Sequence, residues 1–244
     1  MIALEIAVQD AAGARVAAVA GADRVELCAA LGATGGVTPS AAMVETVVAA
    51  GLPVHVLIRC RPGPFVYSQE EVDVMCRDAA HAIRQGAAGV VVGALTVERL
   101  LDLAALARLR DSAKNASATA EVTYHRAMDV AIGAGGGLDA IDELAGLGFD
   151  RVLTSGGAVR AVHGADTLAS LVTQAGGRMQ VMAGGGVRPT DIARLAATGI
   201  DAVHLSAKAV KHFGPDAAGP GGGSNDIEVT CEDVVQAAAA AVRA

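Results

Sequence analysis

The sequence is poor in aromatic residues, in cysteine and in basic charge. It has no Trp, two Tyr and three Phe, which argues against base-stacking platforms and aromatic cages. Lys and Arg number 19 against 26 Asp and Glu, a net charge of −7, so we expect neither a nucleic-acid partner nor an anionic membrane partner. No apolar run reaches the ~18 residues of a membrane span, and the first residues lack a basic signal region. Four cysteines without a C-x-x-C pair indicate a reducing compartment, so we expect a cytoplasmic protein.

Short β-branched runs recur along the chain, and each is followed by an Ala- and Leu-rich stretch with helical spacing. Most of the runs follow a glycine, the residue that favours the left-handed conformation just past a helix. Eight such units, spaced by roughly 25–35 residues, predict an α/β fold, a (β/α)8 TIM barrel, formed by a single domain over residues 1–244. The alternative, a doubly wound open sheet, usually carries a Gly-rich fingerprint after its first strand, and this sequence has none. The predicted strands are residues 3–8, 24–28, 53–59, 88–95, 120–124, 150–154, 179–183 and 201–205.

One segment, residues 214–226, interrupts this rhythm with Gly, Pro, Ser and Asn. We predict a flexible Gly-rich loop there, before a last helix at about residues 231–243. The loop is either a lid or a tolerated insertion, and an insertion is favoured because surface loops accept extra length at little cost. Ser-x-x-Glu at 68–71 and Thr-x-x-Asp at 230–233 predict helix N-termini with capping boxes.

Alternation of side chains along the predicted strands identifies the residues that face the barrel interior. The apolar residues of each strand face the helices, so the polar residues between them point inward. Charged side chains are costly to bury unless they are paired, so these residues must form a network. The inward-facing charged and imidazole side chains belong to Glu5, Glu26, His55, Arg59, Glu121, His125 and His204.

Three of these residues, Glu26, Arg59 and His125, lie at the carboxyl ends of their strands, where active sites of TIM barrels assemble. We therefore predict that they are catalytic. His55 and Glu121 lie nearer the amino ends of their strands, where a purely structural polar core is the favoured interpretation. His125 is a candidate general acid or base, and the Arg59 guanidinium suits carboxylate or phosphate.

The residues after the fifth strand extend this centre. Arg126 and Asp129 are further catalytic candidates, because they follow His125 closely. The alternative is that Arg126 and Asp129 form an ion pair that holds the loop.

Glycine-rich loops after the last three strands predict an anion site. Such loops expose backbone N–H groups, and the loops after strands seven and eight form the common phosphate site of TIM barrels. A tight turn is the alternative explanation for three consecutive glycines. The predicted anion-binding residues are Ser155, Gly156, Gly184, Gly185 and Ser206.

Metal ligands are only weakly indicated. The sequence has no H-x-x-x-H and no clustered carboxylates, so it does not predict a zinc or magnesium cage. Thiolates are the ligands that Cu(I) prefers, and Cys28 ends the second strand while Cys60 follows the third. The two sulfurs could converge if the loop turned Cys60 inward, although its position in the strand pattern faces the helices.

Seven motifs together resemble the CutC copper-homeostasis family. The resemblance extends from the first strand to Ser206 and implies a TIM barrel, a cytoplasmic location, homo-oligomerisation and a role in copper tolerance with copper-ion binding. It also implies that Cys28 helps to bind Cu(I), whereas Cys60 stands where the family usually has proline. The motifs are ADRVELC at 22–28, GGVTPS at 35–40, FVYS at 65–68, GAL at 93–95, HRA at 125–127, RVLTSG at 151–156 and AGGGVR at 183–188.

Two main functional hypotheses follow. The resemblance indicates a copper-handling protein. The residues themselves indicate an enzyme that acts on a small phosphorylated or carboxylated molecule by acid/base chemistry at the carboxyl-terminal mouth of the barrel. A barrel used only for assembly is a third hypothesis, but it leaves the charged mouth unexplained.

Overall fold

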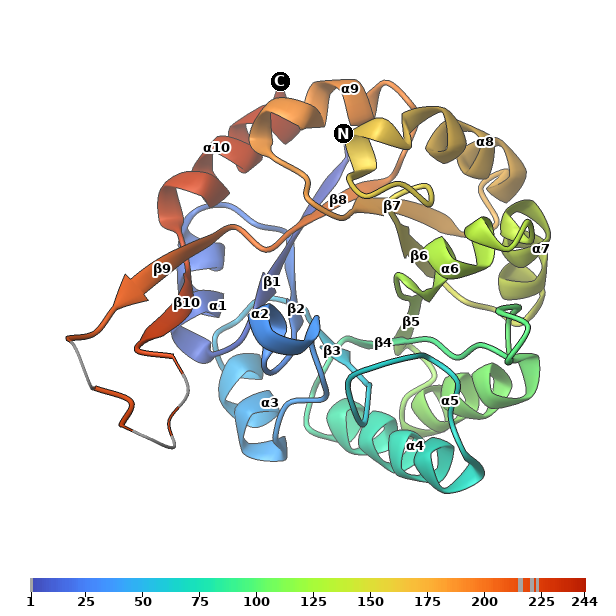
Figure 1. Cartoon of the computed structure of the whole chain (residues 1–244), viewed down its shortest axis with the longest axis horizontal. Coiled ribbons are helices and arrows are strands. Elements are labelled where there is room, and N and C mark those ends of the chain that lie inside the picture. The colour runs from blue at the N-terminus through green and yellow to red at the C-terminus, as the bar shows by residue number, and fades with distance from the viewer. Residues whose placement is uncertain (1, 215–216, 220–221, 223) are drawn as a thin grey trace.

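Eight parallel strands form a closed barrel in the order of the sequence, as predicted for a TIM barrel. In the computed structural model, which describes residues 2–214, 217–219, 222 and 224–244, each strand pairs with its neighbours and β1 closes the ring against β8 (Figure 1). The strands are β1 (Ala3–Val8), β2 (Arg24–Leu27), β3 (Val54–Leu57), β4 (Gly89–Val92), β5 (Glu121–Tyr124), β6 (Arg151–Thr154), β7 (Gln180–Gly184) and β8 (Ala202–Leu205).

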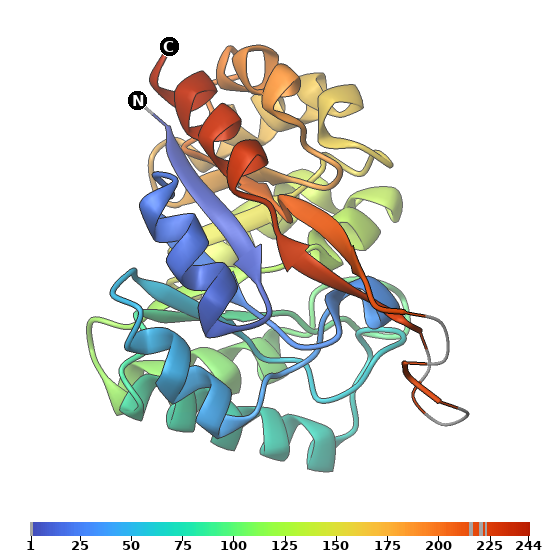
Figure 2. The ribbon, with the colours of Figure 1, turned by 90° about the vertical axis from the view of Figure 1, so that its left-hand side faces the viewer.

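Helices surround the barrel, and no helix in the described ranges is both long enough and apolar enough to cross a lipid bilayer. The last helix packs against β1 and beside α1, so the two ends of the chain lie close together (Figure 2). The helices are α1 (Ala11–Val19), α2 (Leu31–Thr34), α3 (Ala41–Val48), α4 (Gln69–Arg84), α5 (Leu103–Ala116), α6 (Ala127–Gly133), α7 (Gly137–Gly146), α8 (Ala165–Ala175), α9 (Ile192–Ala196) and α10 (Glu232–Arg243), with 3-10 turns η1 (Ala161–His163) and η2 (Pro189–Asp191).

The core has two parts, as strand alternation predicts. Leu4, Ile6 and Val8 belong to the large cluster between the strands and the helices. Inside the barrel, Leu57 and Val91 pack together in a separate small cluster. Leu153, Met182 and Ala202 form a second small cluster inside the barrel, and charged side chains occupy much of the rest of the interior.

The two predicted capping boxes have different outcomes. Ser68 caps α4 in a full capping box with Glu71, so that prediction is confirmed. The box predicted at 230–233 is wrong, because α10 has Cys231 as its N-cap residue and no side-chain cap. Thr230 instead ends a strand, and its hydroxyl packs closely against Gly13 of α1. A Cβ atom added to Gly13 would lie only 2.5 Å from Oγ1 of Thr230.

The sequence does not predict a hairpin after β8. Strands β9 (Lys208–His212) and β10 (Asp226–Thr230) pair antiparallel, and they extend outside the ring (Figure 1). The predicted loop 214–226 therefore ends too late, since Asp226 already pairs with His212. Of that loop, residues 215–216, 220–221 and 223 lie outside the described residues. The hairpin is largely exposed, and β10 does alternate apolar Ile227 and Val229 with polar residues, a signal that the Gly-rich segment before it obscured.

Candidate active site

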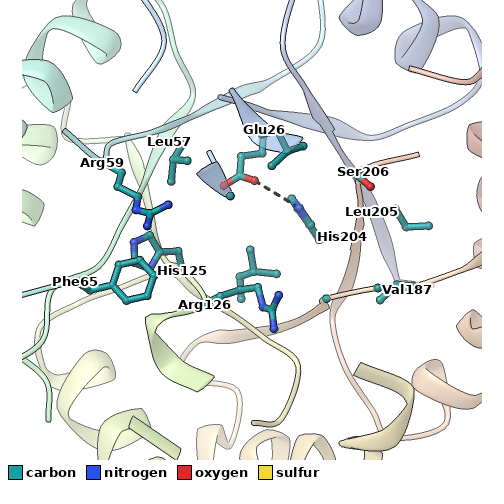
Figure 3. A pocket seen from close by; sticks show the side chains of 15 residues that line it. Glu26, Leu57, Arg59, Phe65, His125, Arg126, Val187, His204, Leu205 and Ser206 are labelled. Atoms are coloured by element: carbon teal, nitrogen blue, oxygen red, sulfur yellow. Dashed lines mark ion pairs between the residues drawn. The ribbon is translucent and has the colours of Figure 1, made fainter. Parts of the chain in front are cut away.

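A cavity of about 250 Å³ lies at the carboxyl-terminal mouth of the barrel, where the sequence places the catalytic centre. It brings together Glu26, Arg59, His125, Arg126, Gly185 and Ser206 (Figure 3). Phe65, His204, Gly186 and Val187 also line it. The other predicted site residues, Cys28, Cys60, Asp129, Ser155, Gly156 and Gly184, are not among the lining residues.

Glu26 projects from β2 into the cavity and is 5% exposed. Its Oε2 atom lies 3.5 Å from Nε2 of His204 on the opposite side of the barrel seam (Figure 3). Burial raises the pKa of Glu26 to about 7, although the positive charge on His204 partly offsets that rise. A carboxyl group with this pKa can accept or release a proton near neutral pH.

His125 lies directly after β5 and keeps a neutral ring. Its Nδ1 atom accepts a hydrogen bond from the Ala127 N–H at 3.1 Å, so the ring proton is on Nε2. Burial, together with the positive charge of Arg59, lowers the pKa of His125 to about 3. Near neutral pH, His125 therefore acts as a hydrogen-bond donor through Nε2 and does not change its charge.

Two residues without a predicted role fix the His125 ring. The Phe65 ring centroid lies 4.7 Å from that of His125. Gly93 follows β4 and lies against the imidazole, because a Cβ at Gly93 would be 2.2 Å from Cε1 of His125. A glycine inside the β-branched run 88–95 is the sequence signal for this close approach.

Arg59 is a buried cation that no carboxylate in the described part of the chain pairs with. Its Nη atoms donate to the backbone carbonyl oxygens of Thr34, Gly36 and Gly63 at 2.8–3.0 Å. Its Nε atom is buried without a partner, and Cζ lies 5.0 Å from the Phe65 centroid. The three carbonyls fix the guanidinium in place, and Arg59 is only 7% exposed. Because this buried positive charge has no carboxylate partner among the described residues, a bound anion would be stabilised beside it.

Asp129 holds Arg126 in place and does not face the cavity. Oδ2 of Asp129 pairs with Nε of Arg126 at 2.8 Å, and Oδ1 accepts from Oγ1 of Thr154 at 2.6 Å and from the Ser155 N–H at 2.8 Å. The ion pair that the sequence left open as an alternative is thus present. Arg126 also donates to Oγ of Ser155 at 3.2 Å. These two contacts hold its side chain at the cavity wall.

Only part of the predicted anion site reaches the cavity. The N–H groups after β6 are already used, since Ser155 donates to Asp129 and Gly156 donates to Oγ1 of Thr154 at 3.0 Å. Gly184 is needed for packing, because a Cβ there would lie 2.4 Å from Cδ1 of Leu153. Gly185 adopts φ +112°, a conformation that favours glycine, and it lines the cavity together with Ser206.

A network of charged side chains fills the barrel below the cavity. Nδ1 of His204 lies 2.8 Å from Oε1 of Glu5, and Oε2 of Glu5 pairs with Nε of Arg24 at 2.6 Å and approaches Nδ1 of His55 at 3.5 Å. The ion pairs with His204 and Arg24 lower the pKa of Glu5 well below its usual value, although burial opposes that shift. Of the predicted inward-facing residues, Glu5, His55 and His204 are therefore paired within this network.

The network continues to the amino-terminal end of the barrel. Nε2 of His55 lies 3.3 Å from Oε2 of Glu121, which also pairs with Arg151 at 2.8 Å. Hydrogen bonding to His55 is the main reason that the pKa of Glu121 falls to about 2. Arg24 and Arg151 also lie in the interior and were not predicted there, although both have the inward parity of their strands.

The chain matches the model of the CutC family over residues 2–209. The chain belongs to the CutC family. A CutC family protein of Agrobacterium fabrum is 46% identical over 214 residues, 87% of this chain and 82% of its own length. One of Caulobacter vibrioides is 42% identical over 206 residues, 84% of this chain and 81% of its own length.

Solved structures agree with this assignment. A CutC crystal structure from Streptococcus agalactiae, named for copper homeostasis, superposes with a TM-score of 0.78 at 30% identity, covering 84% of this chain and 99% of that one. Thiamine phosphate pyrophosphorylase from Pyrococcus furiosus superposes over 99% of this chain with a TM-score of 0.58 at 15% identity, a likeness of fold alone.

The cysteines of this CutC family member do not form a Cu(I) site as they stand. Cys28 is fully buried inside the barrel against Leu57 and Val91, and burial raises the pKa of its thiol, which disfavours the thiolate. Cys60 packs on the helix-side cluster instead. Throughout the described ranges, no group of three or more His, Cys, Asp or Glu side chains is placed to hold a metal ion.

Proposed function

We propose that this protein is an enzyme that binds a small organic carboxylate or phosphate in the mouth cavity and transfers a proton with Glu26. The observation that carries the proposal is the buried guanidinium of Arg59, which has no carboxylate partner among the described residues. A buried charge is costly unless it is paired, so a ligand that supplies a negative charge would be stabilised there.

The rest of the cavity is consistent with such a ligand. Arg126 provides a second guanidinium, held in place by Asp129, and Gly185 and Ser206 bring backbone groups to the same wall. Glu26 has its pKa raised to about 7 by burial, as suits a general acid or base. At about 250 Å³ the cavity is small for a ligand site, so the substrate has few heavy atoms.

Anion binding is tested by calorimetric titration with inorganic phosphate and with malonate. We expect binding by the wild-type protein and a loss of at least tenfold in affinity, about 1.4 kcal/mol, in Arg59→Met. Arg178→Met is the matched control, because Arg178 pairs with Asp142 on the surface. Equal affinities of Arg59→Met and wild type, or no binding of either anion at millimolar concentration, would contradict the proposal. Thermal unfolding of each variant identifies any loss of fold.

We propose copper binding through Cys28 as a second candidate function, supported by the family and by the name of the Streptococcus agalactiae relative. Because Cys28 is enclosed by Leu57 and Val91, Cu(I) would reach it only if this layer opened. Competition titration with a Cu(I) chelator measures the affinity. Weaker binding by Cys28→Ser than by Cys231→Ser would support the candidate, and equal affinities of these two variants and wild type would reject it.

A further inference from the structure

Two buried hydrogen-bond donors in the cavity have no acceptor in the described part of the chain. They are Nε2 of His125 and Nε of Arg59, and both residues line the cavity. Both lie beside the ring of Phe65, His125 with its centroid 4.7 Å away and Arg59 with Cζ 5.0 Å away. Figure 3 shows the three side chains on one side of the cavity. A buried donor without an acceptor is costly, and because both of these residues line the cavity, an oxygen of a bound ligand would satisfy their donors.

The His125 donor is fixed in direction and in charge. The Ala127 N–H donates to Nδ1, while Phe65 and Gly93 pack closely against the ring. The neighbouring guanidinium of Arg59 opposes protonation of the imidazole. A neutral, prealigned N–H next to a guanidinium stabilises an oxygen that gains negative charge during a reaction.

Glu26 lies in the same cavity, on the strand next to the one that precedes Arg59, and Figure 3 shows its carboxylate between Arg59 and His204. Its contact with a cationic group is the 3.5 Å approach to His204, so its second oxygen can face a ligand. A carboxylate and two N–H donors that face one bound carbonyl compound are the groups needed to remove a proton from the carbon next to the carbonyl.

We propose that His125 and Arg59 form an oxyanion site, and that the reaction is abstraction of a proton from the carbon adjacent to a carbonyl group. This inference rests on the proposed function and names its substrate class, a 2-oxo acid or a small phosphorylated ketone. The C–H bond breaks and its proton goes to Glu26. The electron pair forms a C=C bond, and the carbonyl π pair moves to oxygen, where Nε2–H of His125 and Nε–H of Arg59 hold it.

The step is complete without an oxidant or a reductant. Return of the proton from Glu26 to the same carbon exchanges the hydrogen at that centre. In a substrate with a hydroxyl group on that carbon, the hydroxyl proton passes to the enolate oxygen, and delivery of the Glu26 proton to the former carbonyl carbon moves the carbonyl along the chain. Arg126 and the Gly185 wall bind the carboxylate or phosphate of the substrate, which places the reacting carbon between Glu26 and His125.

Oxalate tests the oxyanion site, because it is a planar mimic of the enolate of a 2-oxo acid. Malonate has the same charge but a tetrahedral central carbon. We expect the wild-type protein to bind oxalate at least tenfold more tightly than malonate, and His125→Phe to lose this preference. His81→Gln is the control, since His81 is exposed on α4. If malonate and phosphate bind but oxalate has no advantage, or if His125→Phe keeps the advantage, the inference fails while anion binding stands.

The tautomer of His125 gives a second test on the unmodified sequence. In ¹⁵N-histidine-labelled wild-type protein at pH 7, we expect Nδ1 of His125 to be unprotonated and Nε2 to carry the proton. On saturation with oxalate, the Nε2 proton should move downfield while the ring stays neutral. A proton on Nδ1, a charged ring, or an Nε2 proton that does not shift in the oxalate-saturated protein would overturn the inference.

Discussion

Two residues of the mouth cavity show how burial acts in opposite directions on an acid and a base. Glu26 and His125 are each 5% exposed, and burial disfavours the charged form of both. The pKa of Glu26 therefore rises to about 7, and that of His125 falls to about 3. As a result, the pocket contains a carboxyl group that titrates near neutral pH and an imidazole that does not.

The Glu26 shift predicts a pH-dependent stability difference. The unfolded carboxyl group ionises near pH 4.5 and the folded one near pH 7, so its stabilising contribution is lost as the pH rises between these values. At about 1.4 kcal/mol per unit, the loss is about 3 kcal/mol. Denaturant unfolding at pH 4.5 and pH 8 should show wild type losing about this much stability relative to Glu26→Gln. The assignment would be contradicted if wild type and Glu26→Gln lost the same stability between the two pH values. It would also be contradicted if Glu143→Gln, a variant at an exposed site, differed from wild type as much as Glu26→Gln does.

Asp129 gives a second prediction at the scale of a residue. Its carboxylate accepts from Arg126, Thr154 and the Ser155 N–H, and bonds to a charged group contribute roughly 1.5–3 kcal/mol. We expect Asp129→Asn to lower the free energy of unfolding by about 2 kcal/mol and to weaken phosphate binding, because Arg126 loses its anchor. Asp111→Asn, which breaks only the surface pair with Arg110, should change stability by less than about 1 kcal/mol.

At the scale of elements, local sequence signals predict what local contacts determine. Ser68 and Glu71 satisfy each other within one turn, so the start of α4 could be read from four residues. Thr230 has the same local pattern, but long-range contacts override it, since it pairs with Lys208 and packs on Gly13. The hairpin β9–β10 was missed for a related reason, because it packs on α1 and exposes most of its side chains.

Removal of the α4 cap tests this local account. Ser68→Ala leaves the Glu71 N–H without its side-chain acceptor, and we expect a loss of about 1 kcal/mol in the free energy of unfolding. Ser170→Ala is the matched control, because Ser170 is exposed on α8 and its hydroxyl only bonds back to the Asp166 carbonyl. Equal destabilisation by the two variants in urea unfolding would show that the cap contributes nothing of its own.

At the scale of the whole molecule, the barrel interior is a polar column enclosed by apolar layers. Strand alternation predicted most of that column, including Glu5, His55 and His204, because a period of two is imposed by the backbone. It could not give every partner, since Glu5 meets His204 only when β1 pairs with β8 and closes the ring. The same limit applies to the site. The clustering of Glu26, Arg59 and His125 was predictable, whereas the occupied N–H groups of Ser155 and Gly156 were not. Homo-oligomerisation and a cytoplasmic location stay predictions.

The amino-terminal end of the column predicts sensitivity to acid. His55 and Arg151 hold the pKa of Glu121 down to about 2, so its contribution is present above the unfolded value of 4.5 and is lost as the pH falls toward 2. We expect Glu121→Gln to melt a few degrees below wild type at pH 6, and the gap to close at pH 2.5. A melting difference that is the same at both pH values would contradict this assignment.

The seam of the barrel joins the first strand to the eighth, and the bond between Glu5 and His204 spans 199 positions. During synthesis on the ribosome, the backbone N–H and C=O groups on one edge of β1 therefore have no strand partner until β8 has emerged from the exit tunnel. Loop closure over such a span is entropically unfavourable and slow. We therefore expect the barrel to close largely after translation, from an intermediate whose exposed β1 edge favours aggregation.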